Sequence, residues 1–86
     1  MEETKVIKVL LLSSQEIVVS EIEEIAAEFG DRNCKLTKPY KIIDGALHEW
    51  MEDYTEQNEI MINSDKIVTL VTPSPMIFEQ YSKVTS

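Results

Sequence analysis

The sequence has one cysteine, one histidine, two glycines and no long apolar run. A disulfide needs two cysteines and a structural zinc site needs about four Cys or His ligands, so one chain can form neither. A membrane-spanning helix needs about 20 consecutive apolar residues, so we expect no membrane partner. The N-terminus carries acid where a secretory signal carries base, which predicts a cytoplasmic protein. We expect no metal and no cofactor.

Positive charge is also scarce, with 8 Lys and Arg against 16 Asp and Glu and a formal charge of −8. Such an excess of acid disfavours nucleic acid at long range, because phosphate contacts need Lys or Arg. The one local basic stretch consists of Arg32, Lys35, Lys38 and Lys41. Either these bases neutralise acidic neighbours in strand pairs, or a symmetric ring repeats them around a pore.

The length of 86 residues predicts one domain over residues 1–86. A chain of this size buries only about 60% of the surface that it exposes when unfolded. A single copy would therefore be marginally stable, which favours self-association.

Alternating and β-branched segments predict a mainly β protein. Residues 5–12 (KVIKVLLL) are a strand, Ser13-Ser14-Gln15 a turn, and Ile17-Val18-Val19 the start of a second strand that forms a hairpin with the first. Residues 34–43 are a half-exposed strand in which Pro39 indicates an edge or a bulge, and Asp44-Gly45 is a turn.

Residues 20–30 (SEIEEIAAEFG) leave two structures open. Ser20 and Glu23 have the spacing of a helical capping box, and Gly30 suits a helix C-terminus. A helix would have to begin directly after Val18-Val19 without a linker, so a long second strand to about Ala27 is the alternative. Residues 46–54 are expected to be extended.

The last third of the chain has the clearest pattern. Residues 59–62 (EIMI) and 66–71 (KIVTLV) flank Asn63-Ser64-Asp65 and predict a hairpin. Ser74-Pro75 is typical of an N-cap followed by the first helical position. A short helix over residues 75–84 should cover an open end of the sheet.

Catalysis is not expected. Acids crowd near His48, but the sequence has no second histidine, nucleophile elbow or metal-ligand spacing. The acids are better explained as a solvated face, and Cys34 as a structural residue. Trp50 fits the core of so small a chain, and its alternative role is an exposed anchor for a partner.

Five segments together resemble the Sm-like (Lsm-type) small β-barrels, in particular their phage-type branch. They are residues 6–10 (VIKVL), 15–18 (QEIV), 35–42 (KLTKPYKI), 49–51 (EWM) and 62–70 (INSDKIVTL). The resemblance implies a five-stranded, strongly bent antiparallel barrel over about residues 5–72, followed by the C-terminal helix. It also favours strand over helix for residues 20–29, and a bacterial or phage-infected cell as the setting.

The resemblance further implies a cyclic homo-oligomer of five to seven subunits. In such a ring the fourth strand of one subunit pairs with the fifth strand of the next, which removes exposed sheet edges. The interface residues would be Ile60, Met61, Ile62, Val68, Leu70 and Val71.

By the same resemblance, RNA would bind at two loops that face the pore. The residues implied are Arg32, Asn33, Asn63, Ser64 and Lys66, with Tyr40 as a stacking surface. The expected function is a ring-forming RNA-binding or RNA-chaperone-like protein. Asn63 and Ser64 stand where the family has Arg and Gly, which favours an alternative: an acidic ring scaffold or protein adaptor that binds no RNA.

Overall fold

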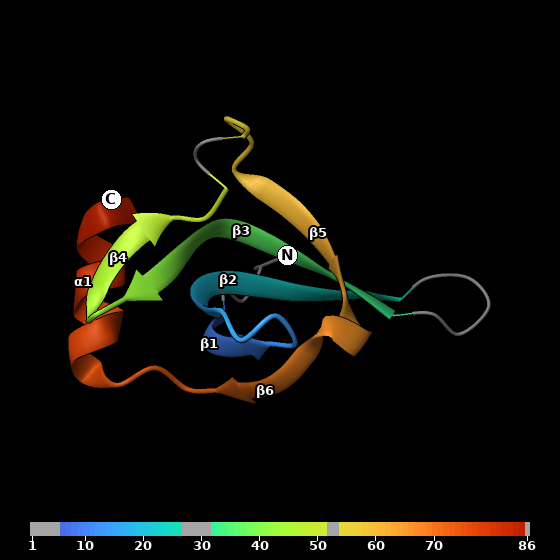
Figure 1. The fold of residues 1–86 in the computed structure, drawn as a ribbon, viewed down its shortest axis with the longest axis horizontal. Coiled ribbons are helices and arrows are strands. Elements are labelled where there is room, and N and C mark those ends of the chain that lie inside the picture. Colours follow the sequence, from blue (N-terminus) through green and yellow to red (C-terminus); the bar gives the residue numbers. More distant parts are fainter. Residues whose placement is uncertain (1–5, 27–31, 52–53, 86) are drawn as a thin grey trace, which may run out of the picture.

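The computed structural model describes residues 6–26, 32–51 and 54–85 (Figure 1). Within these residues one antiparallel sheet has the strand order β4-β3-β2-β1-β6, and β5 pairs with β3 beside β4. The elements are β1 (Ile7–Leu12), β2 (Ile17–Ala26), β3 (Arg32–Ile43), β4 (Ala46–Glu49), β5 (Glu59–Asn63), η2 (Ser64–Lys66), β6 (Ile67–Val71) and α1 (Pro75–Thr85). The predicted mainly β fold is confirmed, with β4 as a short sixth strand.

The first hairpin forms as predicted. β1 and β2 pair antiparallel, with Leu10 opposite Val18. The turn between them places Gln15 at a positive φ of 76°, and the Leu12 backbone N–H donates to the Glu16 carbonyl oxygen at 2.9 Å. The β-branched residues on either side fit the pleated sheet.

The sequence from Ser20 to Ala26 is strand, not helix. β2 pairs with β3 continuously from Glu21 opposite Thr37 to Ala26 opposite Arg32. Tertiary pairing along this ladder outweighs the helix propensity of the Glu- and Ala-rich segment. Residues 27–30 of the proposed helix lie outside the described residues.

Pro39 lies at a β-bulge, one of the two positions that its missing N–H predicted. The β2–β3 register shifts there, so that Lys38 and Pro39 of β3 oppose the single residue Ser20 of β2. Lys38 has a φ of 53°, the left-handed region that non-glycine residues seldom adopt. The bulge bends β3 toward the end of the sheet where α1 packs (Figure 1).

β3 and β4 form a tight hairpin around Asp44 and Gly45, which have φ values of 51° and 80°. Positive φ at both central residues is the signature of the turn type that best suits a twisted hairpin. The turn was predicted correctly. The extended prediction for residues 46–54 holds for β4 but is wrong at Trp50, Met51 and Tyr54, which lie in turns.

The predicted hairpin over residues 59–71 is wrong in its pairing, although both strands and the turn are present. β5 pairs with β3, and β6 pairs with β1. No ladder among the described residues joins β5 to β6. The 3₁₀ turn η2 separates them, so the chain crosses from one end of the curved sheet to the other (Figure 1).

α1 begins and packs as predicted. Ser74 caps it, since the Ile77 N–H donates to Ser74 Oγ at 3.3 Å. Tyr81 is the anchor, with only 1% of its surface exposed. Its hydroxyl donates to the Lys38 carbonyl oxygen at 2.9 Å and accepts from the Glu21 N–H at 3.1 Å. These two hydrogen bonds hold α1 against β2 and β3 at the bulge.

The hydrophobic core is small. Its fully buried cluster is Leu10, Leu12, Val18 and Leu36, against which Ile22, Trp50, Ile62 and Ile67 pack. Each buried aliphatic side chain contributes about 1.5–3 kcal/mol relative to an exposed one. Many other apolar side chains stay exposed, among them Val68 and Met61, so one copy leaves much of its apolar surface in water.

Candidate functional site

The turn after β5 holds the predicted residues Asn63, Ser64 and Lys66. Asn63 is the N-cap of η2, and its Oδ1 accepts a hydrogen bond from the Asp65 N–H at 2.9 Å. Short polar side chains that bond the backbone two residues ahead stabilise such turns. This bond uses the amide oxygen and leaves the Nδ2 group as the donor that a ligand could use. Lys66 is exposed and Ser64 half-buried.

The backbone of Asn33 lies directly beside this turn, because Asn33 and Asn63 are register partners in the β3–β5 ladder. Arg32 is the residue before Asn33. Both had been expected in a turn, yet both belong to β3, since the ladder with β2 continues to Arg32. Their side chains lie outside the described part of the chain. Two predicted RNA-binding segments that are 30 residues apart in sequence are thus neighbours in space.

Tyr40 lies apart from that turn. It is seven residues beyond Asn33 along β3, a span of up to about 23 Å at about 3.3 Å per residue. Its ring meets the Tyr81 ring edge to face at a centroid distance of 5.9 Å. Its hydroxyl donates to the Val84 carbonyl oxygen at 3.3 Å. Tyr40 therefore packs against α1 and does not join the Asn63 turn.

The lysines of the basic stretch are engaged within the chain. Lys35 Nζ lies 3.6 Å from a Glu23 carboxylate oxygen and 3.8 Å from one of Glu59, on the two strands that flank β3. Lys41 Nζ lies 3.1 Å from a Glu16 carboxylate oxygen. For these two lysines the interpretation that they neutralise acidic neighbours is confirmed.

The six predicted interface residues occupy the two ends of the sheet. Within the described residues, β5 has a ladder only with β3, and β6 only with β1. Ile60 and Ile62 are half-buried, whereas the other four, Met61, Val68, Leu70 and Val71, are exposed. Each of these strands therefore offers an outer edge lined by apolar side chains.

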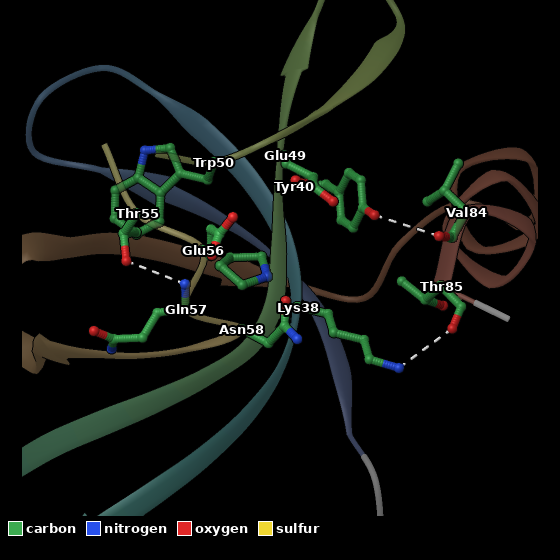
Figure 2. A pocket seen from close by; sticks show the side chains of 11 residues that line it. Lys38, Tyr40, Glu49, Trp50, Thr55, Glu56, Gln57, Asn58, Val84 and Thr85 are labelled. Carbon is green, nitrogen blue, oxygen red and sulfur yellow. Dashed lines mark hydrogen bonds between the residues drawn. The ribbon is translucent and has the colours of Figure 1, made fainter. Parts of the chain in front are cut away.

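A hollow of about 200 Å³ lies between β3, the end of β4, residues 55–58 and the end of α1. Figure 2 shows Trp50, Thr55 and Glu56 grouped together, while Lys38 and Tyr40 extend away from them toward α1. Lys38 Nζ donates to the Thr85 carbonyl oxygen at 3.3 Å. The Lys38 N–H donates to the Asn58 carbonyl oxygen, which holds residues 55–58 against the bulge.

Trp50 is half-buried at this hollow and packs against the core. Its Nε1–H donates to Glu16 Oε2 at 3.4 Å. Hydrogen bonds from Ser14 lower the pKa of Glu16, with further help from Lys41 and Trp50 and against the effect of burial. Sequence reasoning singled out Trp50 but missed Glu49, Glu56 and Asn58 as its neighbours. The only signal for them was the run of acids without a base over residues 46–60.

Two other titratable groups are buried. Desolvation raises the pKa of Cys34, helped by the nearby charge of Glu24, and this keeps the thiol protonated. Burial also raises the pKa of Tyr81 to about 12. Among the described residues no group of three or more His, Cys, Asp or Glu side chains could hold a metal ion.

Residues 5–86 match the model of a family of unknown function, DUF6561, and the chain therefore belongs to that family. No match was found among curated proteins. No helix in the described residues is long and apolar enough to cross a membrane.

Proposed function

We propose that the protein is an Sm-like subunit that assembles into a closed homo-oligomeric ring and binds single-stranded RNA near the Asn63 turn. The observation that carries the assembly is the pair of outer edges on β5 and β6. An unpaired edge is a template for another strand, and natural proteins protect or cover it. Pairing β5 of one copy with β6 of the next uses these two strand edges in every copy.

The exposed side chains at these edges favour the same contact. Val68 and Met61 are 62% and 52% exposed, and Leu70 and Val71 are also exposed. Removing such side chains from water contributes about 25 cal/mol for each Å² of apolar surface that is buried. A head-to-tail contact closes into a ring when its rotation divides a full turn.

The RNA site rests on the neighbouring strand positions of Asn33 and Asn63 and on Lys66 in the adjoining turn. An amide side chain can bond the edge of an unstacked base, and an ammonium group can contact phosphate. A ring would repeat this set once in each subunit. Local positive charge would thereby increase although the chain as a whole is acidic.

Native mass spectrometry tests the assembly. We expect one closed oligomer for the unaltered protein and loss of that oligomer in Val68→Lys, because a charge placed at the β6 edge is costly to bury. The control is Met76→Lys, which places the same charge on an exposed position of α1 and should leave the oligomer intact. If Val68→Lys assembles as the control does, the β6 edge is not the interface.

RNA binding is tested by fluorescence anisotropy with labelled oligouridine and oligoadenine. Asn63→Asp keeps an oxygen that can cap η2 and replaces the amide donor with a negative charge, so the turn should persist while affinity falls at least tenfold. Lys66→Gln should weaken binding and reduce its salt dependence by about one phosphate contact. No saturable binding of either RNA to an intact ring would reject the RNA part of the proposal and leave the assembly standing.

The second candidate is an acidic ring scaffold that binds protein and not RNA. It is favoured by the ion pairs that engage Lys35 and Lys41, which leave little positive charge for phosphate. Salt separates the two candidates, because phosphate binding weakens steeply as salt rises and apolar contact does not.

A further inference from the structure

Two hollows lie on either side of Glu49 and Trp50, which line both. The first is the 200 Å³ hollow beside Glu56 and α1. The second, of about 350 Å³, is also lined by Ile43, Met51 and Tyr54. No residue of β5, of β6 or of the Asn63 turn lines either hollow, so the proposed ring and RNA site leave both of them unused.

The cations at these hollows are already bound. Lys38 donates to the Thr85 carbonyl oxygen, and its ammonium group points away from Trp50 and Glu56 (Figure 2). Lys41 is paired with Glu16. By contrast, no cation in the described residues forms an ion pair with Glu49 or Glu56. Among the described lining residues each hollow has two carboxylates and one lysine, which leaves one excess negative charge in each.

Apolar and aromatic side chains lie next to that charge. Tyr54 is 83% exposed, and Met51 and Ile43 are also exposed. The Trp50 and Tyr40 rings line the first hollow, and aromatic faces attract ammonium and guanidinium groups. Exposed aromatic and Met side chains at a concave surface are typical of protein interfaces.

The backbone at this surface is unusual for its residue types. Lys38 and Met51 have φ values of 53° and 68°, and each lines one of the hollows. Residues held in sparsely populated backbone regions cost about 1–3 kcal/mol each, and they cluster at ligand-binding sites. Each hollow that Glu49 and Trp50 line therefore holds one such residue.

We propose that this surface binds a cationic peptide segment of another protein. A Lys or Arg side chain enters the first hollow between Glu49 and Glu56, and a neighbouring apolar side chain packs on Met51 and Tyr54 in the second. The charge argues against RNA here, because both unpaired groups are carboxylates. It also argues against a second copy of this chain, because the chain has a formal charge of −8 and two such surfaces repel each other.

The test uses the one tryptophan of the chain as its reporter. A capped peptide of alternating arginine and leucine is titrated into the full-length protein while Trp50 fluorescence is followed. Two comparison peptides alternate glutamate with leucine and arginine with serine. We expect the arginine-leucine peptide to shift the fluorescence saturably, the glutamate peptide to have no effect, and the arginine-serine peptide to bind at least tenfold more weakly.

A double variant and a control test whether the peptide binds at this surface. The double variant Glu49→Gln and Glu56→Gln should lower affinity for the arginine-leucine peptide at least tenfold. The control Glu79→Gln removes one charge from an exposed position of α1 and should change affinity less than twofold. Equal binding by the double variant and the control, or no saturable shift with the arginine-leucine peptide, overturns the proposal. Either result leaves ring assembly and RNA binding unaffected, because the Asn63 turn and the edge side chains are unchanged.

Discussion

Removing the Tyr81 hydroxyl by Tyr81→Phe should destabilise the fold more than any other loss of a single oxygen that we have identified. The hydroxyl accepts from the Glu21 N–H and donates to the Lys38 or Thr37 carbonyl oxygen. Thr37 keeps a second partner in Ser20 Oγ at 3.1 Å. In Tyr81→Phe the Glu21 N–H and the Lys38 carbonyl each lose the hydrogen bond that they make with the Tyr81 hydroxyl.

The cost follows from these two lost hydrogen bonds. Each intramolecular hydrogen bond contributes about 1 kcal/mol net, so we expect a loss of about 2 kcal/mol. For a domain of this size each kcal/mol lowers Tm by about 4–8 °C. Chemical unfolding and calorimetry at a fixed protomer concentration measure both quantities. Tyr54→Phe is the matched control, because Tyr54 is 83% exposed and its change should cost less than about 0.5 kcal/mol.

The Tyr81 hydroxyl should also make the free energy of unfolding depend on pH at high pH. Burial raises the folded-state pKa of Tyr81 from 10.0 to about 12, so the unfolded chain loses this proton first as the pH rises. The stability that Tyr81 contributes is complete below pH 10 and is lost between pH 10 and 12. At about 1.4 kcal/mol per pKa unit the loss approaches 2–3 kcal/mol. Tyr81→Phe should lack it, and a Tyr81→Phe protein as stable as Tyr54→Phe with the wild-type alkaline decline would refute the reasoning.

Three further outcomes test the local structure. Gly45→Ala should lower the free energy of unfolding by about 1 kcal/mol, because Gly45 has a φ of 80° that a residue with a Cβ rarely adopts. The added Cβ would meet no atom within 4 Å beyond the neighbouring residues, so the loss would come from the backbone conformation and not from a clash. Asp44→Gly, at a φ of 51°, should cost nothing. Ser74→Ala should cost about 1 kcal/mol and loosen α1, measured by hydrogen exchange at its first turn. Because the pKa of Glu16 is lowered in the folded state, Glu16 contributes stability that is present above pH 4.5 and is lost as the pH falls through the folded-state pKa. Glu16→Gln should therefore weaken the fall in the free energy of unfolding at acid pH, measured by urea unfolding at a series of pH values. A fall as steep as that of the wild type would contradict the assigned role.

Local sequence patterns predicted the structure correctly where a residue type has one strong structural preference. Asp44-Gly45 predicted a tight turn, Pro39 an edge or a bulge, and Ser74-Pro75 a helix start, and the structure has the turn, a bulge and the helix start. Each rests on backbone chemistry within a few residues of the signal. Residues 20–26 were ambiguous for the opposite reason, because only the long ladder with β3 decides between helix and strand.

Pairing partners could not be predicted in the same way. Residues 59–71 have the pattern of a hairpin, and yet β5 lies on β3 while β6 lies on β1. A strand-turn-strand pattern specifies that two strands follow each other, but the partner of each depends on the curvature of the whole sheet. The bulge at Lys38-Pro39 contributes to that curvature. It therefore affects which strands β5 and β6 pair with, although these strands begin more than 20 residues after Lys38.

The proposed peptide surface depends on the same long-range geometry. Its acids are visible in sequence as a run without bases, which by itself is typical of a solvated face. They gather around a hollow because the Asp44-Gly45 turn lays β4 along β3. The Lys38 N–H then fixes Asn58, and with it residues 55–58, to the bulge. The bulge thus anchors α1 through Tyr81 on one side and shapes the acidic hollow on the other, so a change that straightens β3 at Lys38 would disturb both features together.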